Sequence, residues 1–190
     1  MLLKRCYSTR MPLRNTSNSY GSLAKWLHWI SALLIIGMLI YGTIFTTLLP
    51  KGPLRSQLIM IHKSIGLIIL LLIVFRWVWR FINPTPKLLS TQNIFLIKIR
   101  HGLHELLYIT VILMLLSGIL LTATNHYPIP FFGLFEIPTT TFPQSHYWHN
   151  LFGTVHLITA WTLTGLLIIH LFAVFKHHSY NKDETLKRML

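Results

Sequence analysis

The sequence predicts an all-α membrane protein, a bundle of four transmembrane helices, and three observations support this fold class. Hydrophobic residues make up 53% of the 190-residue chain and charged residues only 11%, which is too few charges to cover a soluble protein. The apolar residues gather in four runs, each near the roughly 20 residues that a helix needs to cross a bilayer. Within lipid, a helix satisfies its own backbone hydrogen bonds.

The four predicted spans are separated by polar or proline-containing connections. They cover residues 23–49, 56–78, 103–124 and 150–175. Pro50 ends the first span, and Asn125 with Pro128 ends the third, because proline cannot continue a helix. The second span is less uniform, since Lys63 and Arg76 lie inside it. The fourth span is apolar apart from a few polar residues, two of which are histidines.

Basic residues are distributed unevenly among the loops and termini. They concentrate in the N-terminal segment, in the connection between the second and third spans, and in the C-terminal tail. The first loop holds only Lys51 and Arg55, and the loop before the fourth span holds no Lys or Arg. The positive-inside rule therefore predicts that both termini face the cytoplasm. Because the basic residues behind the net charge of +13 flank the apolar runs, this charge does not indicate a nucleic-acid partner.

The chain divides into three parts. Residues 1–20 form an N-terminal extension with Met11 as an alternative start, and its first ten residues contain Arg and Ser but no acid, as in a transit peptide. Residues 21–180 form the membrane domain, and residues 181–190 form a cytoplasmic tail. The single cysteine, Cys6, excludes an intramolecular disulfide and a cysteine-bound cluster within this chain.

Four of the eleven histidines form two pairs when they are sorted by depth in the membrane. His28 opens the first span near the cytoplasmic surface, at the depth predicted for His170. His62 opens the second span near the outer surface, at the depth predicted for His156. The fourteen residues between His156 and His170 correspond to about 21 Å along a helix and a return to within about 40° of the same face.

Two imidazole pairs, each contributed by two helices, predict bis-histidine ligation of two haem groups. Neutral imidazole can coordinate iron within lipid without placing a charge there. Gly66 and Gly153 fall on the predicted ligand face, where they either give a porphyrin room or are ordinary glycines of membrane helices. Arg76 lies fourteen residues after His62, so it either pairs with a haem propionate or extends to the interface.

The remaining histidines are expected near the membrane surfaces. His101 and His104 open the third span, where they contact a propionate, form part of a quinone site, or are interfacial residues near Glu105. Solvated positions are predicted for His126 and His146. His177 and His178 are either interfacial or touch the edge of the inner haem. The proline-rich loop of residues 125–149 is expected to lie over the outer haem, where it could cover a quinone or oxidant site.

Several ordered motifs of this sequence resemble the bacterial cytochrome b561 family, four-helix di-haem b proteins of the inner membrane. The resemblance covers about residues 14–190 and rests on RNTSNSYGSLAKWLHW, MIHKSIG, RFINPTPK, HGLHELLY and the spacing of His156, His170, His177 and His178. It implies two haem b groups, held by the same two histidine pairs that the depth argument gives. A start at Met11 fits the family better than a start at Met1.

One departure concerns the first ligand of the fourth span. In the family a tryptophan stands beside this ligand, and here His149 follows Trp148. His149 lies seven residues before His156, hence about 10 Å further out, and it breaks the spacing to His170. His156 is therefore the predicted ligand.

The predicted function is electron transfer across the bilayer to or from the quinone pool, with ubiquinone as the expected quinone. The resemblance adds superoxide oxidation at the periplasmic face, for which Lys51, Arg55 and Lys63 are either a cationic patch or ordinary flanking charges. One alternative is a cytochrome b anchor subunit that relays electrons for a partner dehydrogenase. Others are a non-haem di-iron oxygenase, which needs its histidines at one membrane face, and a metal-ion transporter, which usually needs carboxylates within the spans.

Overall fold

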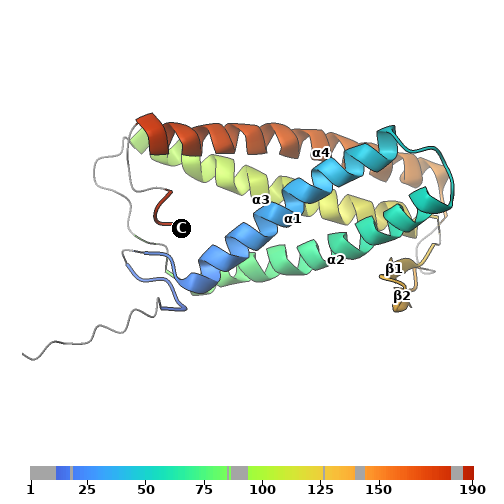
Figure 1. The fold of residues 1–190 in the computed structure, drawn as a ribbon, viewed down its shortest axis with the longest axis horizontal. Coiled ribbons are helices and arrows are strands. Elements are labelled where there is room, and N and C mark those ends of the chain that lie inside the picture. Colours follow the sequence, from blue (N-terminus) through green and yellow to red (C-terminus); the bar gives the residue numbers. More distant parts are fainter. Residues whose placement is uncertain are drawn as a thin grey trace, which may run out of the picture.

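The computed structural model describes residues 12–17, 19–84, 86, 94–125, 127–139, 144–180 and 186–190. Four long helices lie side by side in one elongated bundle (Figure 1). We call the end of the bundle where the first helix starts the inner end, and the opposite end the outer end. Met11 and His126 lie outside the described residues, as do residues 1–11 of the extension and 181–185 of the tail.

All four helices are long and apolar enough to cross a membrane, which confirms the four predicted spans. They are α1 (Ser22–Thr47), α2 (Pro53–Ile82), α3 (Ile94–Ala123) and α4 (His146–Phe175), with a π-helical turn at Lys176–Tyr180. Helix α3 begins well before the predicted residue 103, because hydropathy detects only the apolar part of a helix. The first turns of α3 carry Lys98 and Arg100.

The helix ends follow from local chemistry. Pro53 stands at the start of α2, where its fixed φ and missing N–H cost nothing. Ser145 caps α4, since its side chain accepts a hydrogen bond from the backbone N–H of Trp148. Asn83 leaves the helical conformation at the end of α2, as expected for a residue before proline. These ends set the depth of every residue along each helix.

The bundle is packed inside and apolar outside. Helix α3 lies along α4, and α1 packs against α2, with Ile69 and Leu163 in the core they share. Large apolar side chains face away from the bundle axis: Leu33, Leu71 and Phe172 are 75%, 71% and 72% exposed. Large apolar side chains exposed all around a bundle are unfavourable in water but suit lipid. The chain is therefore a multi-pass membrane protein.

A two-stranded antiparallel hairpin connects α3 to α4 at the outer end, beside the start of α2 (Figure 1). Its strands are β1 (Ile129–Phe131) and β2 (Phe135–Ile137). The sequence predicts a loop over the outer end but no strands. The turn places Phe132 at φ 50° and Gly133 at φ 74°. A left-handed conformation is uncommon for a bulky residue, so the sequence does not reveal this hairpin.

Candidate functional site

A cavity of about 490 Å³ lies between the four helices toward the outer end. Its volume falls within the range of cofactor and small-molecule pockets. Its walls are mainly apolar and include His62 from α2 and His156 from α4. Four glycines, one from each helix, also line it: Gly42, Gly66, Gly118 and Gly153. The two histidines predicted at the outer depth therefore meet around one cavity, together with the two glycines predicted to lie beside them.

The rings of His62 and His156 lie with their centres 6.2 Å apart and their planes at 77°. A metal ion held about 2 Å from one nitrogen of each ring would place the ring centres roughly 6 Å apart. His156 donates from Nδ1 to the backbone carbonyl of Met114 at 2.8 Å, and the Ser117 Oγ lies 3.3 Å from the same nitrogen. A neutral ring with its hydrogen on Nδ1 has Nε2 free to act as a ligand.

His62 is held by apolar contacts. Its ring stacks on Tyr41 at 6.3 Å and meets the ring of Phe45 edge-on at 5.3 Å. Its Nδ1 is buried and has no hydrogen-bond partner among the described residues. A Cβ added at Gly66 would meet no atom within 4 Å, so this part of the cavity wall is open. An imidazole pair, an unpartnered buried nitrogen and open glycine walls fit a flat metal-bearing group such as haem.

At the inner end, three histidines from three helices lie within electrostatic reach of Arg76 of α2. His104 of α3 and His170 of α4 are in ring contact, with centres 5.4 Å apart. Arg76 donates to Nδ1 of His28 at 2.8 Å and to the Ser31 Oγ at 3.2 Å. Arg76 therefore points into the bundle, toward α1.

The contact with Arg76 constrains what His28 can do. A guanidinium only donates, so Nδ1 of His28 accepts, and a neutral ring then carries its hydrogen on Nε2. A histidine that binds metal through Nε2 carries its hydrogen on Nδ1. His28 can therefore become a ligand only when Arg76 leaves Nδ1, and a propionate would offer Arg76 a charged acceptor. His170 can thus be paired either with His28 or with His104, whose ring it touches.

Cations gather beside the inner histidines. Arg80 forms an ion pair with Glu105 at 2.6 Å. The guanidinium carbons of Arg76 and Arg80 lie 5.3 and 5.5 Å from the ring centre of Tyr108, within cation–π range. Tyr108 therefore holds both cations at this end of the bundle. Because Arg80 is already paired with Glu105, it is the charge of Arg76 that suits an anionic group such as a haem propionate.

The other described histidines lie away from the cavity. His149 stands on the first turn of α4, where its Nδ1 is 3.5 Å from the Thr124 Oγ1. His156, and not His149, lines the cavity, in agreement with the fourteen-residue spacing. Exposed positions are occupied by His101, His146 and His178.

Two further cavity residues, Gly42 and Gly118, escape prediction from the sequence. Each follows an inner histidine of its own helix, His28 or His104, by fourteen residues. The same interval separates the outer and inner site residues of α2 and α4. Applied to all four helices, this interval would have indicated both glycines.

Comparison with known proteins gives one consistent result. A family model described as prokaryotic cytochrome b561 matches residues 19–190. The chain is 32% identical over 180 residues to cytochrome b561 homolog 2 of Escherichia coli (strain K12), with 95% of each protein covered. It is 28% identical to cytochrome b561 homolog 1 of the same strain, over 91% of this chain and 97% of that protein. It is 26% identical to a probable superoxide oxidase CybB of Yersinia pestis, over 90% and 95% respectively.

Proposed function

Because the chain belongs to the prokaryotic cytochrome b561 family of membrane electron-transfer proteins, we propose that it is a di-haem cytochrome that carries electrons across the inner membrane. His62 and His156 would hold the outer haem b, and His28 and His170 would hold the inner one. A haem held between two imidazoles would supply single-electron transfer. The observation that carries this proposal is the imidazole pair at the outer cavity.

The surrounding residues orient the ligands and exclude water. The Met114 carbonyl keeps the hydrogen of His156 on Nδ1, which raises the basicity of Nε2. Apolar side chains such as Ile69 and Leu115 line the cavity and would limit the access of water to the haem. At the inner end, Arg76 would give up its contact with His28 to bind a haem propionate. His104 lies beside this site, where it would contact the second propionate or the quinone.

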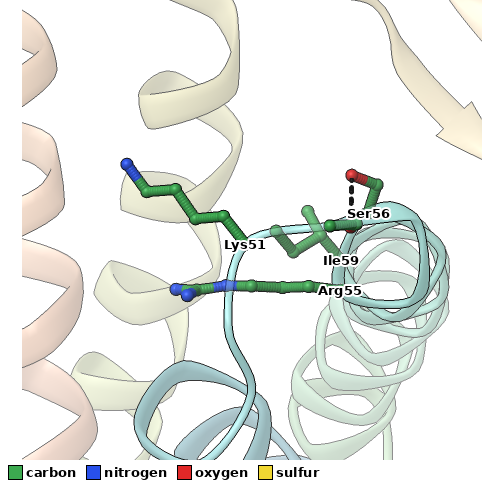
Figure 2. Close-up of a pocket in the computed structure, with 5 residues that line it drawn as sticks. Lys51, Arg55, Ser56 and Ile59 are labelled. Carbon is green, nitrogen blue, oxygen red and sulfur yellow. Dashed lines mark hydrogen bonds between the residues drawn. The ribbon is translucent and has the colours of Figure 1, made fainter.

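A basic recess at the outer end suits an anionic electron donor. A second cavity, of about 320 Å³, is lined by Lys51, Gly52, Arg55, Ser56 and Ile59 (Figure 2). Lys51 and Arg55 extend to the same side of the α1–α2 connection (Figure 2). Arg55 and Lys63 also line the larger cavity. These charges attract small anions and, with the superoxide oxidase among the relatives, they support superoxide as the donor and ubiquinone as the acceptor.

The haem content of the purified protein tests the di-haem proposal. We expect low-spin b-type bands and two haems per chain in the pyridine haemochrome assay. His156→Ala should retain one haem, whereas His149→Ala, a matched change on the same helix, should retain both. A wild-type chain without haem, or haem loss in His149→Ala but not in His156→Ala, would overturn the assignment.

The two inner pairings give opposite outcomes in the same assay. If His28 is the ligand, His28→Ala loses one haem and His104→Ala keeps both. Haem loss only in His104→Ala would instead show that the inner pair is His104 and His170, whose rings are in contact.

The electron donor is tested separately from the haems. Superoxide generated enzymatically should reduce the haems rapidly and should drive ubiquinone reduction at a rate proportional to protein concentration. A chain that holds two haems but does not react with superoxide would refute the donor alone, and would favour a relay for a partner dehydrogenase.

The geometry disfavours a non-haem di-iron oxygenase. Among the described residues, no group of three or more His, Cys, Asp or Glu side chains is arranged to hold a metal ion directly. The pair of His62 and His156 also lies at the other end of the bundle from His28 and His170. A di-iron site requires these side chains together.

A further inference from the structure

The imidazole of His156 rests against α3, a helix that supplies no ligand to the proposed outer haem. The Met114 carbonyl accepts from its Nδ1, and the Ser117 Oγ lies near the same nitrogen. Gly118, which has no side chain, lies against the ring. A Cβ built on Gly118 would lie 3.0 Å from Cε1 and 3.2 Å from Nδ1 of His156. A backbone surface and a hydrogen bond thus hold the same edge of the ring.

His62 rests against α1 in a similar way. A Cβ built on Gly42 would lie 3.3 Å from Cε1 and 3.7 Å from Nδ1 of His62. In both rings the Cε1–Nδ1 edge is the edge that meets the glycine. The two imidazoles are therefore supported by equivalent contacts from α1 and α3, the helices that do not carry them.

We propose that Gly118 and Gly42 are positioning residues that set the rotation of the two outer ligand imidazoles about their Cβ–Cγ bonds. This inference rests on the proposed function, because it concerns the ligands of the outer haem. Ring rotation changes the overlap of imidazole with the iron orbitals. The ferric low-spin spectrum and the reduction potential both depend on this overlap and on the hydrogen bond at the other ring nitrogen.

The spacing predicts a larger effect at Gly118 than at Gly42. A contact of 3.0 Å is tighter than nine in ten real Cβ contacts, so the ring of His156 must yield by a few tenths of an ångström. Moving the ring away from α3 also lengthens its 2.8 Å hydrogen bond to Met114. His62 has no such bond among the described residues, and its Cε1 is 3.3 Å from the added Cβ, so it can adjust more easily.

This role differs from that of a glycine that makes room for a macrocycle. Gly66 lines the same cavity, yet a Cβ there would meet no protein atom within 4 Å. A methyl group at Gly66 would therefore occupy cavity space without turning either ligand. Gly66→Ala should lower haem content, whereas Gly118→Ala should change the properties of a haem that is still bound.

Electron paramagnetic resonance and redox titration of the purified protein test the inference. Gly118→Ala should retain two haems, shift the largest g value and midpoint potential of one haem, and leave the other haem unchanged. Gly42→Ala should shift the same haem by less. The outer haem of Gly118→Ala should also pass to an acceptor apoprotein about tenfold faster than that of the wild type. Alanine has a higher helix propensity than glycine, so neither change should weaken the helices.

Matched controls exist on the same two helices. A Cβ at Gly102 on α3 or at Gly37 on α1 would meet no atom within 4 Å, so both alanine variants should match the wild type. Equal shifts in these controls, or unchanged spectra and potentials in both test variants, would overturn the inference and leave the proposed function intact. A wild type without two haems would refute the proposed function instead.

A second variant keeps the test open if Gly118→Ala does not accumulate. Ser117→Ala removes a hydroxyl 3.3 Å from Nδ1 of His156 without adding an atom. Ser117→Ala and Gly42→Ala, each made singly, should still shift the g value and midpoint potential of the outer haem alone. Wild-type spectra and potentials in both of these variants would overturn the inference.

Discussion

Replacing Ser64 by alanine should release the outer hairpin from α2. The Ser64 side chain is completely buried, and its Oγ accepts a hydrogen bond from the backbone N–H of Phe132 at 2.9 Å. The same Oγ lies 3.0 Å from the Pro130 carbonyl and 2.9 Å from the Met60 carbonyl. A hydroxyl has one hydrogen, so it donates to one of these carbonyls at a time. Ser64 therefore joins the hairpin to the helix that carries His62.

The size of the effect follows from two contributions. A hydrogen bond of this kind contributes about 0.5–1.5 kcal/mol net, and leaving a buried N–H without a partner costs about 1–3 kcal/mol. Phe132 is held at φ 50°, a conformation that persists only when its surroundings enforce it. We therefore expect the free energy of local hairpin opening to fall by about 1–3 kcal/mol, and the open population to rise about 5- to 150-fold.

Hydrogen–deuterium exchange measures this opening directly. Amides of residues 129–137 should exchange about 5- to 150-fold faster in Ser64→Ala than in the wild type, with the centres of α3 and α4 unchanged. Ser56→Ala is the matched control, because among the described residues its Oγ bonds to the Gly52 carbonyl at the start of its own helix and not to the hairpin. Equal exchange of the hairpin in Ser64→Ala and the wild type would refute the reasoning.

Three further predictions concern polar and charged side chains at the two ends of the bundle. Glu105→Gln should change the free energy of unfolding by less than about 1 kcal/mol in a denaturant titration, since the side chains of Arg80 and Glu105 are 31% and 50% exposed; a larger loss would contradict this. Trp29→Phe removes the indole donor to the Met189 carbonyl at 2.7 Å, so carboxypeptidase should trim the C-terminus faster than in the wild type. Arg55→Gln should slow haem reduction by an anionic reductant and weaken its salt dependence, while reduction by a neutral reductant stays unchanged.

The spans were predictable because hydropathy and the lipid environment leave one solution for an apolar run of this length. The start of α3 was not, because its first turns are polar and a helix can continue beyond the hydrocarbon. The hairpin could not be read either, since its turn depends on the left-handed conformation of Phe132. The Phe132 N–H is bonded by Ser64 of α2, a residue far from it in the sequence.

The site was predictable to the extent that it depends on periodicity. Helix geometry alone puts residues fourteen apart, such as His156 and His170, on nearly the same face of α4. This argument selected His156, which lines the cavity together with His62. The contact of His170 with His104 depends on the angle between α3 and α4. The bond from His156 to the Met114 carbonyl involves a backbone atom, which residue types do not reveal.

Residue identity at equivalent depths explains why the open cavity lies where it does. At the outer depth, α1 and α3 carry glycine, while α2 and α4 carry the two histidines. Fourteen residues away, at the inner depth, α1, α3 and α4 carry histidine and α2 carries arginine, so every helix presents a long polar side chain. The outer layer therefore leaves space beside two imidazoles, whereas in the inner layer Arg76 contacts His28 and the ring of His104 contacts that of His170. An inner haem must displace the contact of Arg76 with His28, but an outer haem meets ligands that two glycines already support.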